Sequence, residues 1–298
     1  MTPPLVVAMP GNEAIASDLA HGLGAEIGQL QIREFPDGES YLRFLTDPAR
    51  RTLIIVCTLA HPNDKILQLI FSSATARELG ATRVGLVSPY LAYMRQDRRF
   101  KTGEAVTSRQ VAHLLSDAFD WIVTIDPHLH RYGSLGEIYT IPTRVLHAAP
   151  MISQWVEKNI TNPLIIGPDS ESEQWVSAVA KNAHAPFTVL EKVRRGDRDV
   201  EISVKNLDYL QGRTAVLIDD IISTGRTMIQ GVRHILEHGS PSPVCIAVHG
   251  LFSDDADRVL VGLGARVVTC NTIPHPTNAI DVGPVLIEPT RELSLAAA

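Results

Sequence analysis

The chain has 298 residues, 45% of them hydrophobic and 20% charged, with a formal net charge of −6. That is the composition of an ordinary globular protein, long enough for two domains of about 150 residues each. The negative net charge argues against nucleic-acid binding, which normally requires a basic patch. No apolar run reaches the roughly 18 residues of a membrane span, and Met1-Thr2-Pro3-Pro4 does not begin a secretory signal.

The three cysteines, Cys57, Cys245 and Cys270, lie in apolar runs and do not have the spacing of metal ligands. Cysteines of this kind are typical of reduced core residues in a cytosolic protein. We therefore expect a cytoplasmic protein that associates with neither a membrane nor a nucleic acid.

Short apolar runs alternate with segments of helical periodicity along the whole chain. Strands are expected at 5–9, 29–35, 40–45, 52–57, 83–87, 121–125, 144–147, 164–167, 187–190, 200–204, 216–218, 243–249, 266–269 and 284–287. Helices are expected at 15–23, 63–79, 108–118, 148–159, 173–183, 228–236 and 254–263, with 290–298 a loose tail or a short helix. This order predicts an α/β fold of two similar domains, 1–145 and 146–298, each a mainly parallel sheet flanked by helices.

The stretch Phe35-Pro36-Asp37-Gly38-Glu39 has the composition of a turn and joins two strand-like segments. It places two carboxylates and a phenylalanine at the tip of a hairpin. From this chemistry alone, an ordinary surface hairpin is favoured over a binding element.

The segment 88–101 follows an expected strand, at the edge where α/β sheets usually bind ligands. Four cations in it can neutralise a polyphosphate, and arginine can do so through two hydrogen bonds at once: Arg95, Arg98, Arg99 and Lys101. Gln96 and Asp97 could orient a base or a metal-bound water. The alternative is a solvated charged loop.

Two histidines, His128 and His130, follow Asp126 at the end of the next expected strand. Histidine in this position is a plausible ligand of a metal or a phosphate, although a single histidine is more often structural. In the second half, Pro168-Asp169-Ser170-Glu171-Ser172 also follows a strand and precedes a helix. Its serines could donate to a phosphate, and Asp169 is a candidate metal ligand.

The segment Glu191–Asp199 is dense in charge, contains Gly196 and has no helical periodicity. We interpret it as a mobile basic flap that could close over phosphates and exclude water. The alternative is a solvated hairpin tip.

The most informative stretch is Val216–Met228, where a buried strand leads into Asp219 and Asp220, a small-residue turn and a helix. Unpaired N–H groups and the dipole at a helix N-terminus favour an anion, and Gly225 permits close backbone approach. Hydroxyls from Ser223, Thr224 and Thr227 add donors. The carboxylates could accept hydrogen bonds from a sugar diol or hold a metal, so the stretch predicts a ribose 5-phosphate site. The alternative is a helix cap after an exposed acidic turn.

This stretch resembles the 5-phosphoribosyl 1-pyrophosphate (PRPP) loop shared by phosphoribosyltransferases and PRPP synthetases. Together with the other motifs in their order, it makes nearly the whole chain similar to the ribose-phosphate pyrophosphokinase family. The resemblance implies two phosphoribosyltransferase-type domains, a homo-oligomer with a dimer as its building unit, and Mg²⁺ as the metal. It also implies transfer of the β,γ-pyrophosphoryl group of ATP to the C1 hydroxyl of ribose 5-phosphate, giving PRPP and AMP.

The resemblance also implies roles for particular residues. ATP would be bound by the turn residues Phe35, Asp37 and Glu39, which in this family usually reach in from a neighbouring subunit, and by Arg95, Gln96 and Asp97. Magnesium would be held by His128, rather than His130, and by Asp169, while Lys192 and Arg194 would act in catalysis. Ribose 5-phosphate would be held by Asp219, Asp220, Ser223, Thr224, Gly225, Arg226 and Thr227.

Three positions depart from the commonest family pattern. Ser223 stands where many members carry an acidic residue, so the loop is closer to those of phosphoribosyltransferases and archaeal-type synthetases. Arg226 replaces a usual glycine, and Ser170-Glu171-Ser172 replaces a glycine-rich loop.

Two alternatives remain on the sequence alone. A PRPP-consuming phosphoribosyltransferase would need Asp219–Thr227 but not the 95–97 loop or the first domain. A catalytically silent homologue that regulates a true synthetase would tend to lose the flexible-loop and metal positions. His128, Asp169, Lys192 and Arg194 are all present, which favours an active enzyme.

Overall fold

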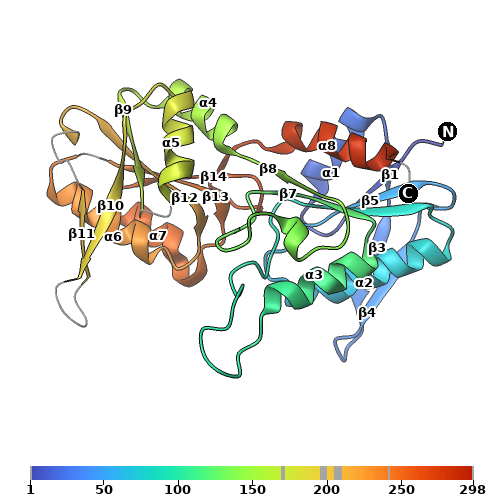
Figure 1. Cartoon of the computed structure of the whole chain (residues 1–298). Helices are drawn as coiled ribbons and strands as arrows, with labels where there is room; N and C mark the ends of the chain where they lie inside the picture. The colour runs from blue at the N-terminus through green and yellow to red at the C-terminus, as the bar shows by residue number, and fades with distance from the viewer. Residues whose placement is uncertain (1, 169–171, 195–199, 205–209, 241, 297–298) are drawn as a thin grey trace. The chain divides into compact units, whose positions relative to one another are not determined.

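The computed structural model describes residues 2–168, 172–194, 200–204, 210–240 and 242–296 (Figure 1). The chain forms two compact units, Met1–Leu146 with Gly283–Ala298, and His147–Val282. The first boundary is one residue from the expected one. The second unit, however, ends at Val282, whereas the sequence analysis extended it to residue 298.

The first unit contains a sheet of six described strands that are all parallel, in the order β2-β1-β5-β6-β7-β8. These strands are β1 (Leu5–Ala8), β2 (Glu26–Gly28), β5 (Thr52–Val56), β6 (Arg83–Ser88), β7 (Trp121–Ile125) and β8 (Thr143–Leu146). Strands β5 to β7 are almost entirely buried, as expected for apolar runs covered by helices on both faces.

The direction of the crossovers decides which helix covers which face of this sheet. From β1 the chain moves outward to β2 through α1 (Glu13–Leu23), whereas from β5 it moves the other way through α2 (Asn63–Glu78) and α3 (Thr107–Ala118). Right-handed crossovers in opposite directions place their helices on opposite faces. Accordingly, α2 packs beside α3, and α1 packs beside α8 (Gly283–Leu295) on the other side (Figure 1).

A separate antiparallel hairpin, β3 (Leu30–Glu34) and β4 (Ser40–Phe44), carries the turn at Phe35–Glu39. The turn is closed by Phe35 N–H donating to the Glu39 carbonyl at 2.8 Å, and Gly38 adopts a left-handed φ of 91°. The expected hairpin is thus present, with Asp37 and Glu39 exposed at its tip.

The second unit contains a sheet of seven described strands in the order β11-β10-β9-β12-β13-β14-β15. They are β9 (Pro163–Gly167), β10 (Phe187–Arg194), β11 (Val200–Val204), β12 (Thr214–Ile222), β13 (Val244–Gly250), β14 (Arg266–Cys270) and β15 (Asn278–Ile280). Only the pair of β10 and β11 is antiparallel, and the expected mainly parallel sheet is confirmed.

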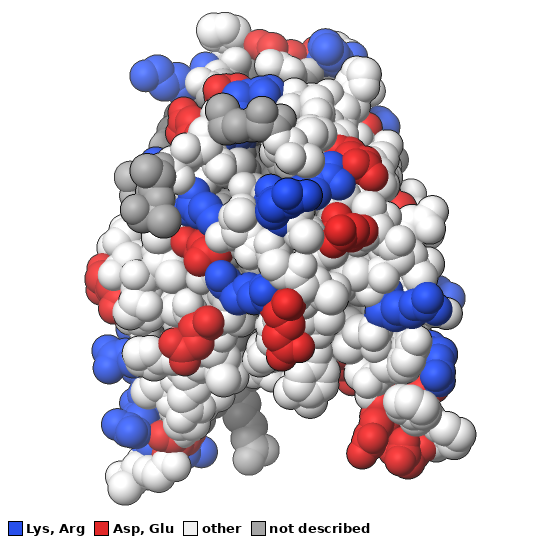
Figure 2. Space-filling view, turned by 90° about the vertical axis from the view of Figure 1, so that its right-hand side faces the viewer, with Lys and Arg blue, Asp and Glu red and all other residues white. Residues whose placement is uncertain are grey.

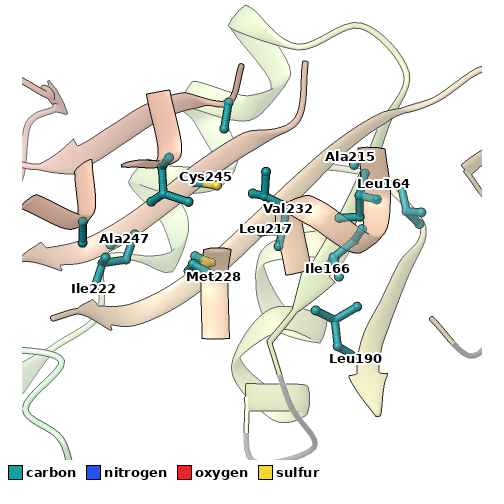
Figure 3. Packing of buried hydrophobic residues seen from close by; sticks show 14 of the residues in the cluster. Leu164, Ile166, Leu190, Ala215, Leu217, Ile222, Met228, Val232, Cys245 and Ala247 are labelled. Carbon is teal, nitrogen blue, oxygen red and sulfur yellow. The ribbon is translucent and has the colours of Figure 1, made fainter. Parts of the chain in front are cut away.

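Helices α4 (Ala149–Asn159) and α5 (Glu173–Asn182) pack together, as do α6 (Arg226–Glu237) and α7 (Ala256–Gly262). The buried face of α6 meets side chains of β9, β10, β12 and β13 in one apolar core (Figure 3). The labelled members in that view include Met228 and Val232 of α6, Leu217 of β12 and Leu190 of β10. Gly231 allows the close approach, because an added Cβ would lie 2.8 Å from both Leu190 and Leu217.

All three cysteines lie among the described residues, where they are buried and form no disulfide, as expected. Burial raises the pKa of Cys57 to about 12, a rise that nearby Lys65 partly opposes, and burial alone raises the pKa of Cys245 to about 12. Both thiols therefore stay protonated at neutral pH, and a thiol is a much weaker nucleophile than a thiolate.

The surface carries both signs of charge, interspersed over the face shown in Figure 2. Within the described residues, no helix combines the length and the apolar character needed to cross a membrane.

The end of the chain differs from the prediction of a strand at 284–287, and of the two alternatives for 290–298, a loose tail or a short helix, it agrees with the helix. Residues 283–295 form helix α8, with Leu286, Thr290 and Leu293 buried at helical spacing. Arg291 donates to the Gly22 carbonyl of α1 at 2.6 Å, and Arg83 donates to the Leu293 carbonyl at 2.9 Å. These tertiary contacts stabilise a helix despite Pro289 in its interior, which local propensity disfavours.

We predict that Leu286→Ala lowers the free energy of unfolding by about 2–5 kcal/mol, because the side chain is fully buried and its loss leaves a cavity. Leu295→Ala is the matched control on the same helix, since Leu295 is 69% exposed, and its effect should stay within about 0.5 kcal/mol. Urea denaturation followed by circular dichroism measures both, and equal midpoints for the two variants would contradict the packing of α8.

Candidate active site

The predicted phosphate-binding loops lie at the switch point of the second sheet. From β9 the chain crosses to β10, whereas from β12 it crosses to β13 in the opposite direction. The carboxyl ends of β9 and β12, which are adjacent parallel strands, therefore lie where sheets of this kind usually bind ligands. The loop after β12 begins at Ser223, and the loop after β9 begins at Pro168.

The acidic pair lies within β12 rather than after it. Asp219 pairs with Ala247 of β13, and the strand continues to Ile222. Asp219 Oδ1 accepts from Asp220 N–H at 3.0 Å, and Asp220 Oδ1 accepts from Ile221 N–H at 2.7 Å. Both carboxylates are half-buried and held on regular backbone, so their positions are well defined for binding a ligand.

The turn from β12 into α6 has the geometry of an anion site. Gly225 is the residue before the helix and adopts φ 65° and ψ 6°, a left-handed conformation that glycine reaches without strain. Helix α6 starts at Arg226, and the N–H groups of a first helical turn have no partner within their own helix. Ser223, Thr224 and Thr227 surround this terminus in sequence, so a phosphate there would meet both N–H and O–H donors.

A second segment, Leu251–Ala256, braces this turn and was not predicted. The Ile222 carbonyl accepts from the N–H groups of both Leu251 and Phe252 at 3.0 Å, and the hydroxyls of Ser223 and Ser253 are 3.4 Å apart. A Cβ on Gly225 would lie 2.9 Å from the Ala256 Cβ. The loop is therefore fixed by tertiary contact as well as by its own sequence.

The bracing segment has an unusual backbone. Phe252, Asp254 and Asp255 have φ values of 46°, 58° and 55°. Left-handed conformations are uncommon for residues other than glycine, and they persist where the surrounding structure imposes them. The ring of Phe252 packs beside the ring of His275, with 4.6 Å between the two ring centroids. The sequence carries no signal for this segment, because the strain depends on these contacts.

The basic segment contributes Lys192 and Arg194, both on β10. Its backbone pairs with β11, with Lys192 opposite Ile202 and Arg194 opposite Val200. The described part is thus a hairpin that extends the sheet. Residues 195–199 of the predicted flap lie outside the described residues, as do Asp169, Ser170 and Glu171 of the loop after β9.

In the first unit, the candidate residues follow β6 and β7, two neighbouring parallel strands. Arg95, Arg98, Arg99 and Lys101 are exposed, as a solvated basic loop would be. Gln96 lies beside the start of α3, where its Oε1 accepts from the Thr107 hydroxyl at 3.1 Å. Asp97 differs from these residues, because its side chain is only 1% exposed and is paired with Arg131 at 2.9 Å.

After β7, Asp126 is buried with a left-handed φ of 34°. His128 and His130 follow it, with ring centroids 5.5 Å apart. In the part of the chain that the structure describes, no group of three His, Cys, Asp or Glu residues could hold a metal.

The hairpin tip is preorganised by an arginine. The Arg33 guanidinium lies 4.0 Å from the Tyr41 ring centroid and 4.7 Å from that of Phe35, and these two rings pack edge to face at 6.1 Å. Phe35 nevertheless remains 40% exposed, so its ring is available to a ligand.

Comparison with known proteins agrees with this architecture. Residues 5–118 match the model of the N-terminal domain of ribose phosphate pyrophosphokinase, and residues 134–285 match that of the phosphoribosyl transferase domain. A solved phosphoribosylpyrophosphate synthetase from Mycobacterium smegmatis has the same fold, with a TM-score of 0.82, 24% identity, and coverage of 97% of this chain and 98% of that one. The fold and the loop after β12 thus define a protein with phosphoribosyltransferase-type domains.

Two curated relatives narrow the class further. The ribose-phosphate pyrophosphokinase of Sulfurisphaera tokodaii is 31% identical over 95% of this chain and 98% of its own length. That of Methanopyrus kandleri is 32% identical over 97% of this chain and 99% of its own length. The chain belongs to the ribose-phosphate pyrophosphokinase family, and the similarity to archaeal members that the Ser223 loop predicted is confirmed.

We predict that Gly225→Ala destabilises the protein by about 1–3 kcal/mol, because it adds left-handed strain and a contact with Ala256. Gly239→Ala is the matched control, since Gly239 also has a left-handed φ, of 81°, but open space around its Cβ position. Adding Ala256→Gly should restore part of the lost stability to Gly225→Ala but none to Gly239→Ala. Thermal unfolding measures the two single and the two double variants. Equal losses of stability in the two single variants, with no recovery in either double variant, would show that the contact is unimportant.

Proposed function

We propose that this enzyme transfers the β,γ-pyrophosphoryl group of ATP to the C1 hydroxyl of ribose 5-phosphate, releasing AMP and forming PRPP. The observation that carries the proposal is the loop from Ser223 to Gly225, which joins the acidic end of β12 to the N-terminus of α6. In it, main-chain N–H groups and hydroxyls of Ser223, Thr224 and Thr227 bind the 5-phosphate, with Arg226 adding a cation. Asp219 and Asp220 accept hydrogen bonds from the ribose hydroxyls.

The nucleotide side of the site is assigned to the first unit. Arg95 neutralises the triphosphate, and Gln96 orients the base. Since the Gln96 Oε1 accepts from Thr107, its amide N–H groups are left to donate to ring nitrogens of adenine. The hairpin tip adds Phe35, Asp37 and Glu39, and its exposure supports a role in a homo-oligomer, where the tip of one subunit completes the site of a neighbour.

Magnesium is proposed as the metal, with His128 and Asp169 as its protein ligands. Mg²⁺ usually keeps several waters and binds through one or two carboxylates together with substrate phosphates, so a small protein ligand set fits it. His128 lies at the end of β7, and Asp169 lies outside the described residues. When bound, the ion supplies charge neutralisation on the phosphate oxygens.

The protein's own contribution to the chemistry is positioning and charge. The sugar hydroxyl is oriented by Asp219 and Asp220, while Lys192 and Arg194 stabilise negative charge on the transferred group. Phosphoryl-transfer reactions depend mainly on these two effects. We assign the enzyme to the cytoplasm, because its three buried cysteines form no disulfide, as is usual in a reducing compartment.

The decisive experiment incubates purified protein with MgATP, with and without ribose 5-phosphate, and resolves the nucleotides by chromatography. AMP should appear only with the sugar and in equal amount to PRPP. ADP would instead show transfer of a single phosphoryl group. No turnover, with ribose 5-phosphate or PRPP still bound, would favour a silent regulatory homologue or a phosphoribosyltransferase.

We further predict that Lys192→Ala lowers kcat by about 10³-fold while changing KM much less, because the cation acts on charge that develops in the transition state. Lys181→Ala, at an exposed lysine in the last turn of α5, removes the same charge away from the strand ends and should leave kcat unchanged. Steady-state assays of AMP formation measure both. A near-normal kcat for Lys192→Ala would remove Lys192 from catalysis.

A further inference from the structure

The most consequential unassigned contact lies between the two nucleotide-side loops. Arg131 follows the His128 segment after β7, and Asp97 lies in the loop after β6, a separation of 34 residues. Arg131 Nη1 donates to Asp97 Oδ1 at 2.9 Å and to Oδ2 at 3.0 Å. The Asp97 side chain is 1% exposed and that of Arg131 35%.

This ion pair compensates the cost of burying the Asp97 carboxylate. A carboxylate removed from water is costly unless it is paired and hydrogen-bonded. Arg131 provides both, so Asp97 can occupy the interior of the loop in its charged form. Burial and pairing also leave the Asp97 side chain poorly placed to contact a nucleotide.

Neighbouring contacts join the same two loops at their backbone. The Tyr132 hydroxyl donates to the Asp97 carbonyl at 3.1 Å and lies 3.1 Å from the Ser108 hydroxyl. The Ser108 N–H in turn donates to the Gln96 carbonyl at 3.3 Å. The backbone of Gln96 and Asp97 is thereby tied to α3 and to the segment that follows β7.

We infer that Arg131 is a positioning residue for the nucleotide. Through Asp97 it fixes the loop carrying Arg95 and Gln96 against the segment carrying His128, and Asp97 acts through this pair rather than by touching ATP. The inference rests on the proposed function, which it deepens, and it changes the role that the family resemblance implied for Asp97.

The test compares Arg131→Gln, Asp97→Asn and the double variant. Calorimetry gives the Kd of MgATP without sugar, and assays give both KM values. Each single variant should raise the Kd and KM of ATP about tenfold or more, because the ion pair is lost and with it the anchor of the loop that carries Arg95 and Gln96. The KM of ribose 5-phosphate should change less than about twofold, which a general loss of structure would not produce.

The double variant separates positioning from direct contact. If Asp97 acts only through Arg131, adding Asp97→Asn to Arg131→Gln weakens ATP binding no further. If Asp97 touches the nucleotide, the double variant binds ATP markedly more weakly than Arg131→Gln, and the inference is overturned.

Arg77→Gln is the matched control in the same unit. Arg77 is 38% exposed and pairs with Asp120 at 3.0 Å, just before β7 begins, at the opposite edge of the sheet. It should lower the unfolding midpoint without changing the Kd of ATP. A similar loss of ATP affinity in this control would show a structural effect and overturn the inference.

Further outcomes remain decisive. Unchanged ATP affinity in Arg131→Gln overturns the inference. If Arg131→Gln does not fold, Arg131→Lys is tested instead. This variant keeps a cation and should weaken ATP binding, but less than tenfold. An ATP affinity equal to that of the wild type would overturn the inference. A wild-type protein that binds ATP but forms no AMP contradicts the proposed function alone, and one that does not bind ATP contradicts both.

Discussion

The close packing of α6 on the second sheet is the constraint on which the proposed sugar-phosphate site depends. Gly231 brings the helix so near that an added Cβ would lie 2.8 Å from Leu190 and Leu217. The helix is then fixed at its N-terminus by Gly225, which approaches Ala256 closely. Because the buried face is apolar and closely packed, small movements of the helix cost free energy. The N–H groups that point toward the anion position are therefore held still by the core behind them.

At the corresponding position of the first unit, the switch point of its sheet, the loop is bound by side chains of the protein itself. There the switch point lies between β1 and β5, and the loop after β5 contains Thr58. Its N–H donates to the Oδ1 of Asn12, a 4% exposed residue, at 2.7 Å, and its carbonyl accepts from Lys65 Nζ at 2.8 Å. Side chains of the protein thus bind backbone groups at this position. The proposed nucleotide residues lie instead after β6 and β7, farther along the same edge.

Local patterns predicted most of this architecture, and tertiary contacts account for what they missed. The stretch around Asp219 and Gly225 was identifiable because strand, acidic pair, turn and helix are all encoded within a few residues. The first turn of α8 was predicted as a strand, because Pro289 opposes one continuous helix locally, while the buried Leu286 and the packing of α8 on α1 stabilise it. The pair of Asp97 and Arg131 could not be predicted from spacing, since the two residues are brought together only by adjacent strands β6 and β7.

The two proposed binding regions, one in each unit, would recognise phosphate by different physical means. In the region proposed for the sugar phosphate, main-chain N–H groups at the start of α6 would be the main donors, and they have no rotamers to lose and no proton to gain. In the region proposed for the nucleotide, recognition would depend on exposed arginines, whose long side chains lose conformational entropy when they bind. If the pair of Asp97 and Arg131 anchors the backbone of that loop, the loop loses less conformational entropy when ATP binds. A buried ion pair that contributes little to net stability can thus still contribute to binding.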